Sequence, residues 1–454
     1  MNPALTSVAI AAALASLLAP HVSPAPQADW SVLERVIASH DVPSTDAERV
    51  RTPLASDAAR VLYLVRPHDT DPAIDHFLKD HYAIFYRSAK QNGLLFVFFP
   101  GTYGQPHGYQ LLLDEAARAG YKAVGLEYPD ANSDPRASAV AQICARIADP
   151  DCPASVRRAR LSGGTAPGGT SVTPANSILN RLASLLRYLD REHPADGWGA
   201  FLRGTSLAWD RMAAGGHSQG AGMAAFLAKE HLVARVALWS GPFDYLPALG
   251  RFPPWMETAS ATPLGRWYGM VHADEPGEST LIAGWRVLGL PGQPVVLGGG
   301  PIPAAHGFIV TRRPRGPASP KAIVNAAHGS VATDFRTPLD GSGRPAYGPV
   351  WDAMFGRERR RMMRTAILLF VTIFLVAPAA LSQPPDDRLI VPGVQIGKWR
   401  LGMSVDELAR IHGKENGTLR FLKGRPAMLI FCARRCNIVG RQTTSAFSRL
   451  AVPR

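Results

Sequence analysis

The sequence predicts an α/β fold in which about eight mostly parallel strands form one sheet with helices on both faces. Three observations support this prediction. Apolar runs of strand length alternate with segments of helical periodicity from residue 58 to residue 334. The run LLFVFFPG at 94–101 is apolar until its final Pro-Gly, as expected for a strand buried on both faces of a parallel sheet. The stretch GGHSQG at 215–220 joins an expected strand directly to an expected helix.

The expected elements follow one another in a regular order. An aromatic stretch at 81–89 lies between the first two strands. A segment at 130–173, rich in Pro, Ser, Gly and Arg, interrupts the pattern and is expected to pass over the sheet. Prolines bound the helix that follows it. The strands are expected at 58–67, 94–101, 121–130, 211–218, 233–244, 265–275 and 294–300, and the helices at 109–120, 174–194 and 219–231.

Charge is distributed unevenly along the 454 residues, whose net charge is +13. Residues 357–454 hold 18 Lys and Arg against 6 Asp and Glu, which leaves 31 basic and 30 acidic residues in the first 356. The large first region is therefore nearly neutral, and the sequence predicts no nucleic-acid partner for it. Because 46% of all residues are hydrophobic, the chain can bury a sizeable core.

Both ends of the chain carry segments that resemble targeting signals. Residues 1–28 have an apolar run followed by Pro and Ala, which is typical of a secretory signal peptide and predicts an exported protein, periplasmic or secreted. A globular domain is expected at 29–356. At 357–383 a basic cluster precedes an apolar run, which is either the signal-like start of a fused neighbouring frame or a membrane anchor, so membrane contact is expected only through 364–381. Residues 384–454 are expected to form a small basic α+β module.

The four cysteines form two local pairs. Cys144 and Cys152 lie on either side of a Pro-containing turn, and an oxidising compartment would favour a disulfide between them. Cys432 and Cys436 lack histidine or cysteine partners at the spacing of a zinc site, so no metal is expected there.

The junction GGHSQG has the form G-x-S-x-G, with Gly216, Ser218 and Gly220 at its fixed positions. At such a turn the serine adopts a strained backbone conformation that lifts its hydroxyl clear of the sheet, and the glycines leave room for it. Because a strand leads in and a helix leads out, the sequence predicts that Ser218 is a nucleophile.

From roughly Val61 to Thr333 the chain resembles the α/β-hydrolase superfamily. The segments that carry the resemblance are GGHSQGAG at 215–222, SGPFD at 240–244 and FFPGTYGQP at 98–106, which are similar to those of exported bacterial esterases and lipases. The resemblance implies a catalytic triad in the chain order serine, acid, histidine, and an oxyanion hole after an early strand.

The resemblance also implies a histidine after the last strand, where His328 stands in NAAHGSVATD. Serine is a weak nucleophile by itself, so an imidazole must take its proton during attack on a carbonyl. Two other histidines compete less well for this role. His306 lies in a Pro- and Ala-rich loop, and His217 in the elbow itself is expected to serve packing.

Three residues are candidates for the acid of the triad. Asp274 is preferred because it follows the next-to-last expected strand, the usual place for the acid in this superfamily. Glu275 beside it and Asp244 after the preceding strand remain alternatives, since chain order supports all three. The acid would hold the imidazole tautomer and stabilise the imidazolium.

The oxyanion hole is expected to use two backbone amides. One is the amide of Gln219, the residue after the nucleophile. The other comes from the loop after LLFVFF, where Gly101, Thr102 and Tyr103 are candidates and Thr102 is preferred.

These features predict an exported serine hydrolase that cleaves carboxylic esters through an acyl-enzyme at Ser218, with no metal or organic cofactor. The alternatives are an acyltransferase or amidase with the same nucleophile, or a non-catalytic binding or surface protein on the same fold. The expected partner is a small-molecule or lipid-like ester, whose acyl length the sequence does not specify. Several aromatic residues near these loops either line a substrate pocket or belong to the core: Tyr103, Tyr109, Trp239, Trp255, Trp267 and Tyr268.

Overall fold

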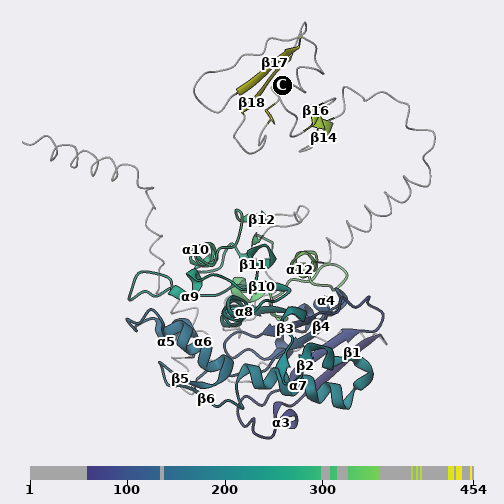
Figure 1. Cartoon of the computed structure of the whole chain (residues 1–454), viewed down its shortest axis with the longest axis vertical. Coiled ribbons are helices and arrows are strands. Elements are labelled where there is room, and N and C mark those ends of the chain that lie inside the picture. The colour runs from purple at the N-terminus through teal and green to yellow at the C-terminus, as the bar shows by residue number, and fades with distance from the viewer. Residues whose placement is uncertain are drawn as a thin grey trace, which may run out of the picture. The chain divides into compact units, whose positions relative to one another are not determined.

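The computed structural model describes residues 59–132, 138–297, 307–313 and 326–356, together with short strands between 390 and 451 (Figure 1). The predictions made for residues 1–28 and 357–383 lie outside the described residues. The chain divides into two units, Met1–Arg364 and Thr365–Arg454. Across the described ranges, no helix combines the length and the apolar composition needed to cross a membrane.

The second unit contains two three-stranded antiparallel sheets. Cys432 and Cys436 lie at the closed end of a hairpin, where Cys432 pairs with Asn437 and Ala433 pairs with Cys436. The strands are β14 (Ile390–Val391), β15 (Gln395–Ile396) and β16 (Trp399–Arg400) in one sheet, and β17 (Met428–Ala433), β18 (Cys436–Arg441) and β19 (Leu450–Ala451) in the other.

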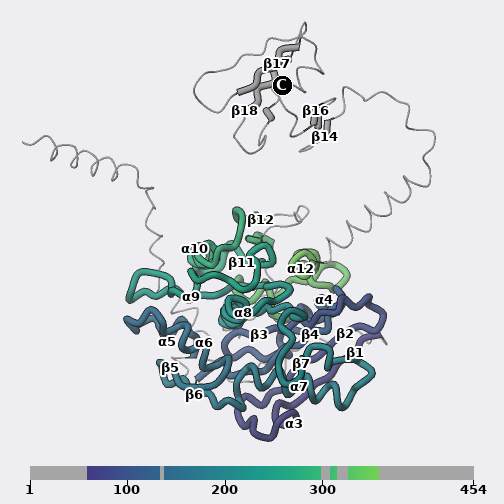
Figure 2. The backbone as a smooth tube through the Cα atoms, in the orientation of Figure 1, coloured from purple at the N-terminus to yellow at the C-terminus, as the bar shows by residue number. Residues whose placement is uncertain are grey.

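The first unit is built on a nine-stranded sheet in the order β1-β2-β4-β3-β9-β10-β11-β13-β12. Figure 2 traces the backbone of this unit. Strand β2 is antiparallel to both of its neighbours, and every pair from β4 to β12 is parallel. The mostly parallel sheet predicted from the alternating pattern is therefore confirmed. Its strands are β1 (Arg60–Val65), β2 (His81–Tyr86), β3 (Leu95–Phe99), β4 (Lys122–Gly125), β9 (Met212–His217), β10 (Arg235–Trp239), β11 (Trp267–His272), β12 (Val295–Leu297) and β13 (Phe308–Thr311).

Two strands differ from the sequence-based expectation. The aromatic stretch at 81–89 forms β2, whose six residues are all buried. The strand expected at 294–300 is β12, which lies at the edge of the sheet, and the four-residue β13 pairs between it and β11. Strand β13 was missed because its short apolar segment, FIVT, follows a run rich in Pro, Ala and Gly that resembles a loop.

Helices cover both faces of the sheet, as β3 shows most directly. Its residues alternate between two hydrophobic clusters, with Leu95, Val97 and Phe99 in one and Phe96 and Phe98 in the other. The first cluster includes residues of α6 (Cys152–Ser162), α7 (Ile178–Glu192), α8 (Gln219–Glu230) and α10 (Glu278–Leu288), and the second includes residues of α4 (Gln110–Arg118) and α12 (Gly348–Phe355).

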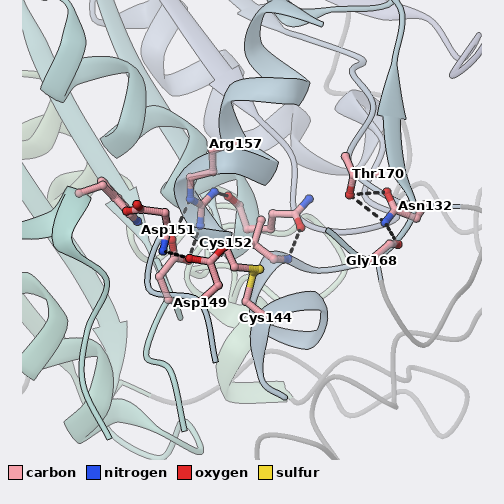
Figure 3. Close-up of a disulfide and its surroundings, with 12 residues drawn as sticks. Asn132, Cys144, Asp149, Asp151, Cys152, Arg157, Gly168 and Thr170 are labelled. Carbon is pink, nitrogen blue, oxygen red and sulfur yellow. Dashed lines mark hydrogen bonds and ion pairs between the residues drawn. A yellow bond between two sulfur atoms is a disulfide. The ribbon is translucent and has the colours of Figure 1, made fainter. Parts of the chain in front are cut away.

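The segment that interrupts the alternating pattern adds a small hydrophobic cluster, and its helix α6 also packs into the first cluster. It contains α5 (Val140–Cys144), α6 and a hairpin of β5 (Gly164–Ala166) and β6 (Thr170–Val172). The predicted disulfide is present: Cys144 at the end of α5 bonds to Cys152 at the start of α6, with an S–S distance of 1.98 Å (Figure 3). Asn132 holds the hairpin by donating to Gly168 O at 3.0 Å and to Thr170 Oγ1 at 3.1 Å.

Short elements complete the first unit. The helical ones are α3 (Pro67–Thr70), α9 (Pro254–Glu257), α11 (Ala326–Ser330) and the 3-10 turns Pro106–Tyr109, Pro194–Asp196, Trp198–Phe201, Trp209–Arg211 and Leu264–Arg266, and the two-residue strands are β7 (Leu202–Arg203) and β8 (Ser206–Leu207).

Strand β2 carries a buried histidine. The Nδ1 atom of His81 accepts a hydrogen bond from the Glu127 amide at 3.0 Å, which requires an unprotonated nitrogen at that position. Burial, together with the nearby positive charge of Arg181, lowers the pKa of His81 to about 3. The folded protein therefore holds this imidazole neutral.

Acid should destabilise the fold through His81. Its pKa falls from 6.5 to about 3 on folding, so between these values the unfolded chain binds one proton more. The contribution of His81 to the free energy of unfolding should then fall by about 1.4 kcal/mol for each pH unit of acidification. In His81→Asn the amide oxygen can replace Nδ1 as acceptor without this proton uptake. Urea unfolding of the full chain between about pH 7 and pH 5 should show a smaller pH slope for H81N than for wild type, whereas equal slopes would contradict the assignment.

Candidate active site

Ser218 stands between the end of β9 at His217 and the start of α8 at Gln219. Its φ of 55° and ψ of −120° lie in a backbone region that residues other than glycine rarely adopt. Such a conformation costs on the order of 1–3 kcal/mol and persists only where the surroundings enforce it. The Ser218 amide donates to Trp239 O at 2.8 Å, which ties the turn to the end of β10.

The glycines around Ser218 are required by close approach of the backbone. A side chain at Gly216 would overlap the backbone of Gly220, and one at Gly220 would overlap the carbonyl of Phe99 at the end of β3. A side chain at Gly241 would overlap the Ser218 carbonyl. The small residues of GGHSQG therefore allow the elbow to pack between β3 and β10, and the resulting turn holds Ser218 in its strained conformation.

His328 and Glu275 form a buried pair. The Nδ1 atom of His328 lies 2.6 Å from Glu275 Oε1, and both side chains are 1% exposed or less. The Ser240 hydroxyl donates to the other carboxylate oxygen, Oε2, at 2.5 Å. Ser240 follows β10 directly and itself has a positive φ of 47°. Ser240 was not identified from the sequence, although it opens the SGPFD segment that carried the resemblance.

Burial shifts the pKa values of this pair toward the least charged state. It raises the pKa of Glu275 to about 8, against the opposing effects of the Ser240 hydrogen bond and of His272. It lowers the pKa of His328 to about 4. The pair therefore binds its first proton at higher pH, and its second at lower pH, than isolated glutamate and histidine side chains would suggest.

The carboxylate beside His328 is that of Glu275, one of the two alternatives, and not that of the preferred Asp274. The Asp274 side chain is 61% exposed, and its Oδ2 atom lies 3.9 Å from His272 Nδ1. The two acids are adjacent in the loop after β11, and only the second is directed into the interior. Adjacent acidic residues cannot be distinguished by chain order, and the longer glutamate reaches the histidine from one position further along.

Asp244, the third candidate, has a different role. It forms a buried ion pair with Arg157 of α6, in which Arg157 Nε donates to Asp244 Oδ2 at 2.8 Å. Trp255 Nε1 donates to the same oxygen at 3.2 Å. These contacts link α6 to the loop after β10, and they use both oxygens of the Asp244 carboxylate.

The loop at 101–104 lies against Ser218. A Cβ atom built on Gly101 would be 3.3 Å from Ser218 Cβ. Three of its four amides already have acceptors: Gly101 donates to Tyr109 Oη at 3.1 Å, Gly104 donates to the Gly101 carbonyl at 2.8 Å, and the Tyr103 amide hydrogen-bonds the Asp130 carboxylate. The Thr102 amide is therefore the donor of this loop that remains for a substrate oxygen.

Gln219 occupies the first position of α8, where a backbone N–H has no partner within the helix. Its side chain is held in place by the interrupting segment. The side-chain amide nitrogen donates to the Asp130 carbonyl, and Oε1 accepts from the Val140 amide at 3.0 Å. The Gln219 amide thus lies at a fixed helix N-terminus beside the serine, a favourable place for a developing negative charge.

The predicted aromatic residues belong mostly to the core. Tyr103 is 36% exposed, whereas the other five are at least 94% buried. Trp239, for example, packs against Phe96, Phe98 and Phe355. His306 lies outside the described residues.

The elements that position these groups share one edge of the sheet. Loop 101–104 follows β3, Ser218 follows β9, Ser240 follows β10, Glu275 follows β11, and His328 follows β13. The carboxyl ends of parallel strands meet at one edge, so five separate loops converge there. Three features decide the fold: the convergence of these loops, the sheet whose second strand is antiparallel to its neighbours, and the turn from strand through Ser218 to helix.

The chain has the α/β-hydrolase fold. No family model and no curated protein matches its sequence. Among solved structures, it is similar to a bacterial heroin esterase, with 14% identity, a TM-score of 0.30, and coverage of 57% of this chain and 77% of the esterase. It is also similar to EstE1, a thermostable carboxylesterase from a metagenomic library, with 13% identity, a TM-score of 0.31, and coverage of 72% and 95%. An esterase from the archaeon Pyrobaculum calidifontis has 12% identity, a TM-score of 0.27, and coverage of 64% and 85%. At these values the likenesses do not bear on function.

The hydrogen bond between His328 and Glu275 should be visible by proton NMR. A buried imidazole Nδ1 proton shared with a carboxylate is strongly deshielded and exchanges slowly with water, so the wild type should show a low-field resonance. Glu275→Ala should remove this resonance, and the matched change Asp274→Ala should retain it. Loss of the resonance in D274A with retention in E275A would contradict the pairing described above.

Proposed function

We propose that this protein is a serine hydrolase that cleaves carboxylic esters, with Ser218 as nucleophile, His328 as general base and Glu275 as the acid of the triad. The observation that carries the proposal is the strained Ser218 at a strand-to-helix junction, on the same sheet edge as a buried histidine whose Nδ1 contacts a carboxylate at 2.6 Å. The combination supports nucleophilic catalysis because it supplies a serine hydroxyl at a strained turn, a histidine to act as base and a carboxylate that orients the histidine.

Acylation would begin with attack of Ser218 Oγ on the ester carbonyl carbon. As the new C–O bond forms, the hydroxyl proton passes to Nε2 of His328, and the carbonyl oxygen becomes an oxyanion. The amides of Thr102 and Gln219 would stabilise that oxyanion; each such donor typically contributes about 3 kcal/mol in the transition state. The bond to the alkoxy oxygen then breaks, and the alcohol leaves with the proton from His328.

Deacylation repeats these steps with water as nucleophile. His328 accepts a proton from water as the hydroxide attacks the acyl carbonyl, and it returns the proton to Ser218 Oγ when that bond breaks. The carboxylic acid leaves and the serine is regenerated. Glu275 keeps the Nδ1 proton in place throughout, and Ser240 in turn orients Glu275 through its 2.5 Å hydrogen bond.

Export is part of the proposal. The signal-like composition of residues 1–28 supports it, and so does the disulfide between Cys144 and Cys152, since such bonds persist mainly in oxidising compartments.

The proposal predicts esterase activity that depends on Ser218. The full-length protein should release p-nitrophenol from at least one member of a chain-length series of p-nitrophenyl esters. Ser218→Ala should reduce kcat/KM by at least about 1,000-fold, because the nucleophile is lost. Ser171→Ala is a matched control, since Ser171 lies exposed on β6, and it should retain wild-type activity.

Other outcomes of the same assay would favour the alternatives. Equal chromophore release by wild type and S218A across the series would contradict the esterase proposal. Transfer of the acyl group to an added alcohol in preference to water would favour an acyltransferase, and cleavage of the matching anilides would favour an amidase. The absence of both activity and fluorophosphonate labelling would favour a non-catalytic binding protein.

The proposal also predicts the pH dependence of kcat/KM. On the acid side of the profile, kcat/KM should rise with pH at values above 6.5. His328 accepts the serine proton only when Nε2 is free of a proton and Glu275 is ionised. When the pair binds one proton, it is either an imidazolium with a carboxylate or an Nε2-protonated imidazole with a carboxylic acid, and neither form can act as base. Burial raises the pKa of Glu275 to about 8, so this protonation occurs above the ordinary histidine value.

The measurement is kcat/KM against pH, followed at the isosbestic wavelength of p-nitrophenol and its anion. We expect the acid limb between 6.5 and about 8, with loss of activity as the pH falls through it. A limb below 6.5 would contradict the raised pKa of Glu275.

A further inference from the structure

His217 and Tyr109 form a buried chain of hydrogen bonds beside the nucleophile. The Gly101 amide donates to Tyr109 Oη at 3.1 Å, and Tyr109 Oη lies 3.1 Å from His217 Nδ1. The other nitrogen of His217, Nε2, lies 2.9 Å from the carbonyl oxygen of His328. The Tyr109, His217 and His328 residues are all at least 96% buried, so each of these bonds is shielded from water.

The direction of every bond in this chain follows from its last acceptor. A carbonyl oxygen can only accept, so Nε2 of His217 carries a proton and donates a hydrogen bond to the His328 carbonyl oxygen. In the neutral ring Nδ1 is then an acceptor, and the Tyr109 hydroxyl donates to it. The Tyr109 oxygen accepts from Gly101 in turn. Every donor in the chain therefore has an acceptor, and the tautomer of His217 is fixed.

This series of hydrogen bonds connects the three groups that the proposed reaction uses. Gly101 precedes Thr102, which is a proposed oxyanion donor. His217 precedes the nucleophile, and the His328 carbonyl belongs to the proposed base. The rings of His217 and His328 also pack with centroids 4.5 Å apart. Fixing these groups relative to one another is what an acyl-transfer site requires, because an error of about 1 Å can reduce the rate a hundredfold.

The loop at 101–104 packs directly against the hydroxyl group of Tyr109. A Cβ built on Gly104 would lie 3.0 Å from Tyr109 Oη, and one on Gly101 would lie 3.3 Å from His217 Nδ1. A Cβ on Gly104 would also lie 2.8 Å from the Gly101 carbonyl, so a side chain there requires the loop to shift, and a side chain at Gly101 would make tight contacts. The glycines of the PGTYGQP segment thus allow the loop to rest on the Tyr109–His217 pair.

We propose that Tyr109 and His217 are positioning residues that hold the oxyanion loop in register with Ser218 and His328. The inference rests on the proposed function, and it gives His217 a role beyond the packing expected from the sequence. Neither residue touches the reacting atoms. They set the position of the Thr102 amide. That position determines how strongly the site binds the tetrahedral oxyanion, and it affects binding of the planar ester less.

Tyr109→Phe tests this proposal with little change of shape. It leaves the Gly101 amide and His217 Nδ1 without their buried partner, so the loop should shift. We expect kcat/KM for the best p-nitrophenyl ester to fall about tenfold or more, mostly through kcat, with KM changed less than about threefold. The Ki of a trifluoromethyl ketone of the same acyl length should rise by the same factor, because this inhibitor forms a tetrahedral oxyanion on the serine.

The inhibitor separates positioning from general damage to the fold. A partly unfolded sample has fewer active sites but leaves both KM and Ki unchanged. Tyr121→Phe is the matched control, since it removes a buried tyrosine hydroxyl that donates to the Phe355 carbonyl at 3.0 Å, away from the site. It should alter neither Ki nor kcat/KM.

His217→Gln provides a second, independent variant. Its side-chain amide can still donate to the His328 carbonyl, but it lacks the acceptor for Tyr109 at the Nδ1 position. H217Q should raise Ki as Y109F does, and the double variant should raise it no further, because both break the same connection.

The outcomes distinguish this inference from the proposed function. Active wild type with unchanged Ki and kcat in Y109F, or multiplicative effects in the double variant, would overturn the positioning role alone. Wild type that neither hydrolyses any ester nor reacts with a fluorophosphonate would overturn the proposed function and this inference with it.

Discussion

The positive φ of Ser218 is the constraint on which the rest of the site depends. It exists because glycines at 216, 220 and 241 let the turn pack against the ends of β3 and β10, where any side chain would overlap the backbone. The strain is therefore sustained by the packing of the sheet edge, and the fold and the site are coupled. A protein that required only a strand-to-helix turn would have no need of this conformation.

Around this turn the protein buries polar groups at the sheet edge and pairs several of them in two connected series of hydrogen bonds. One runs from Ser240 through Glu275 to the His328 ring, and the other runs from the Gly101 amide through Tyr109 and His217 to the His328 backbone. His328 is thus held by its ring and by its carbonyl. Burial strengthens these bonds and also makes each of them costly to lose, which explains why a few hydroxyl groups can govern the geometry of the whole site.

The sequence was sufficient to predict the architecture. It was insufficient to predict which site residues meet, because that depends on the direction of their side chains. Alternating patterns predicted the parallel sheet, and small residues at 215–222 predicted the elbow, because both are local properties. Asp274 and Glu275 are neighbours, so only the path of the loop after β11 decides which one faces His328. Strand β13 escaped prediction because four apolar residues after a Pro- and Gly-rich run give too weak a signal. The role of His217 depends on Tyr109, more than 100 residues away in the chain.

The central claim is that Ser218 is a nucleophile activated by its surroundings. It is tested most directly by treating the folded full-length protein with a fluorophosphonate and locating the adduct by peptide mass spectrometry. The account predicts one phosphonyl group, on the peptide that contains Ser218, and no adduct on that peptide after prior unfolding in urea. An unmodified Ser218 in the folded protein, or an adduct confined to another serine, would contradict it.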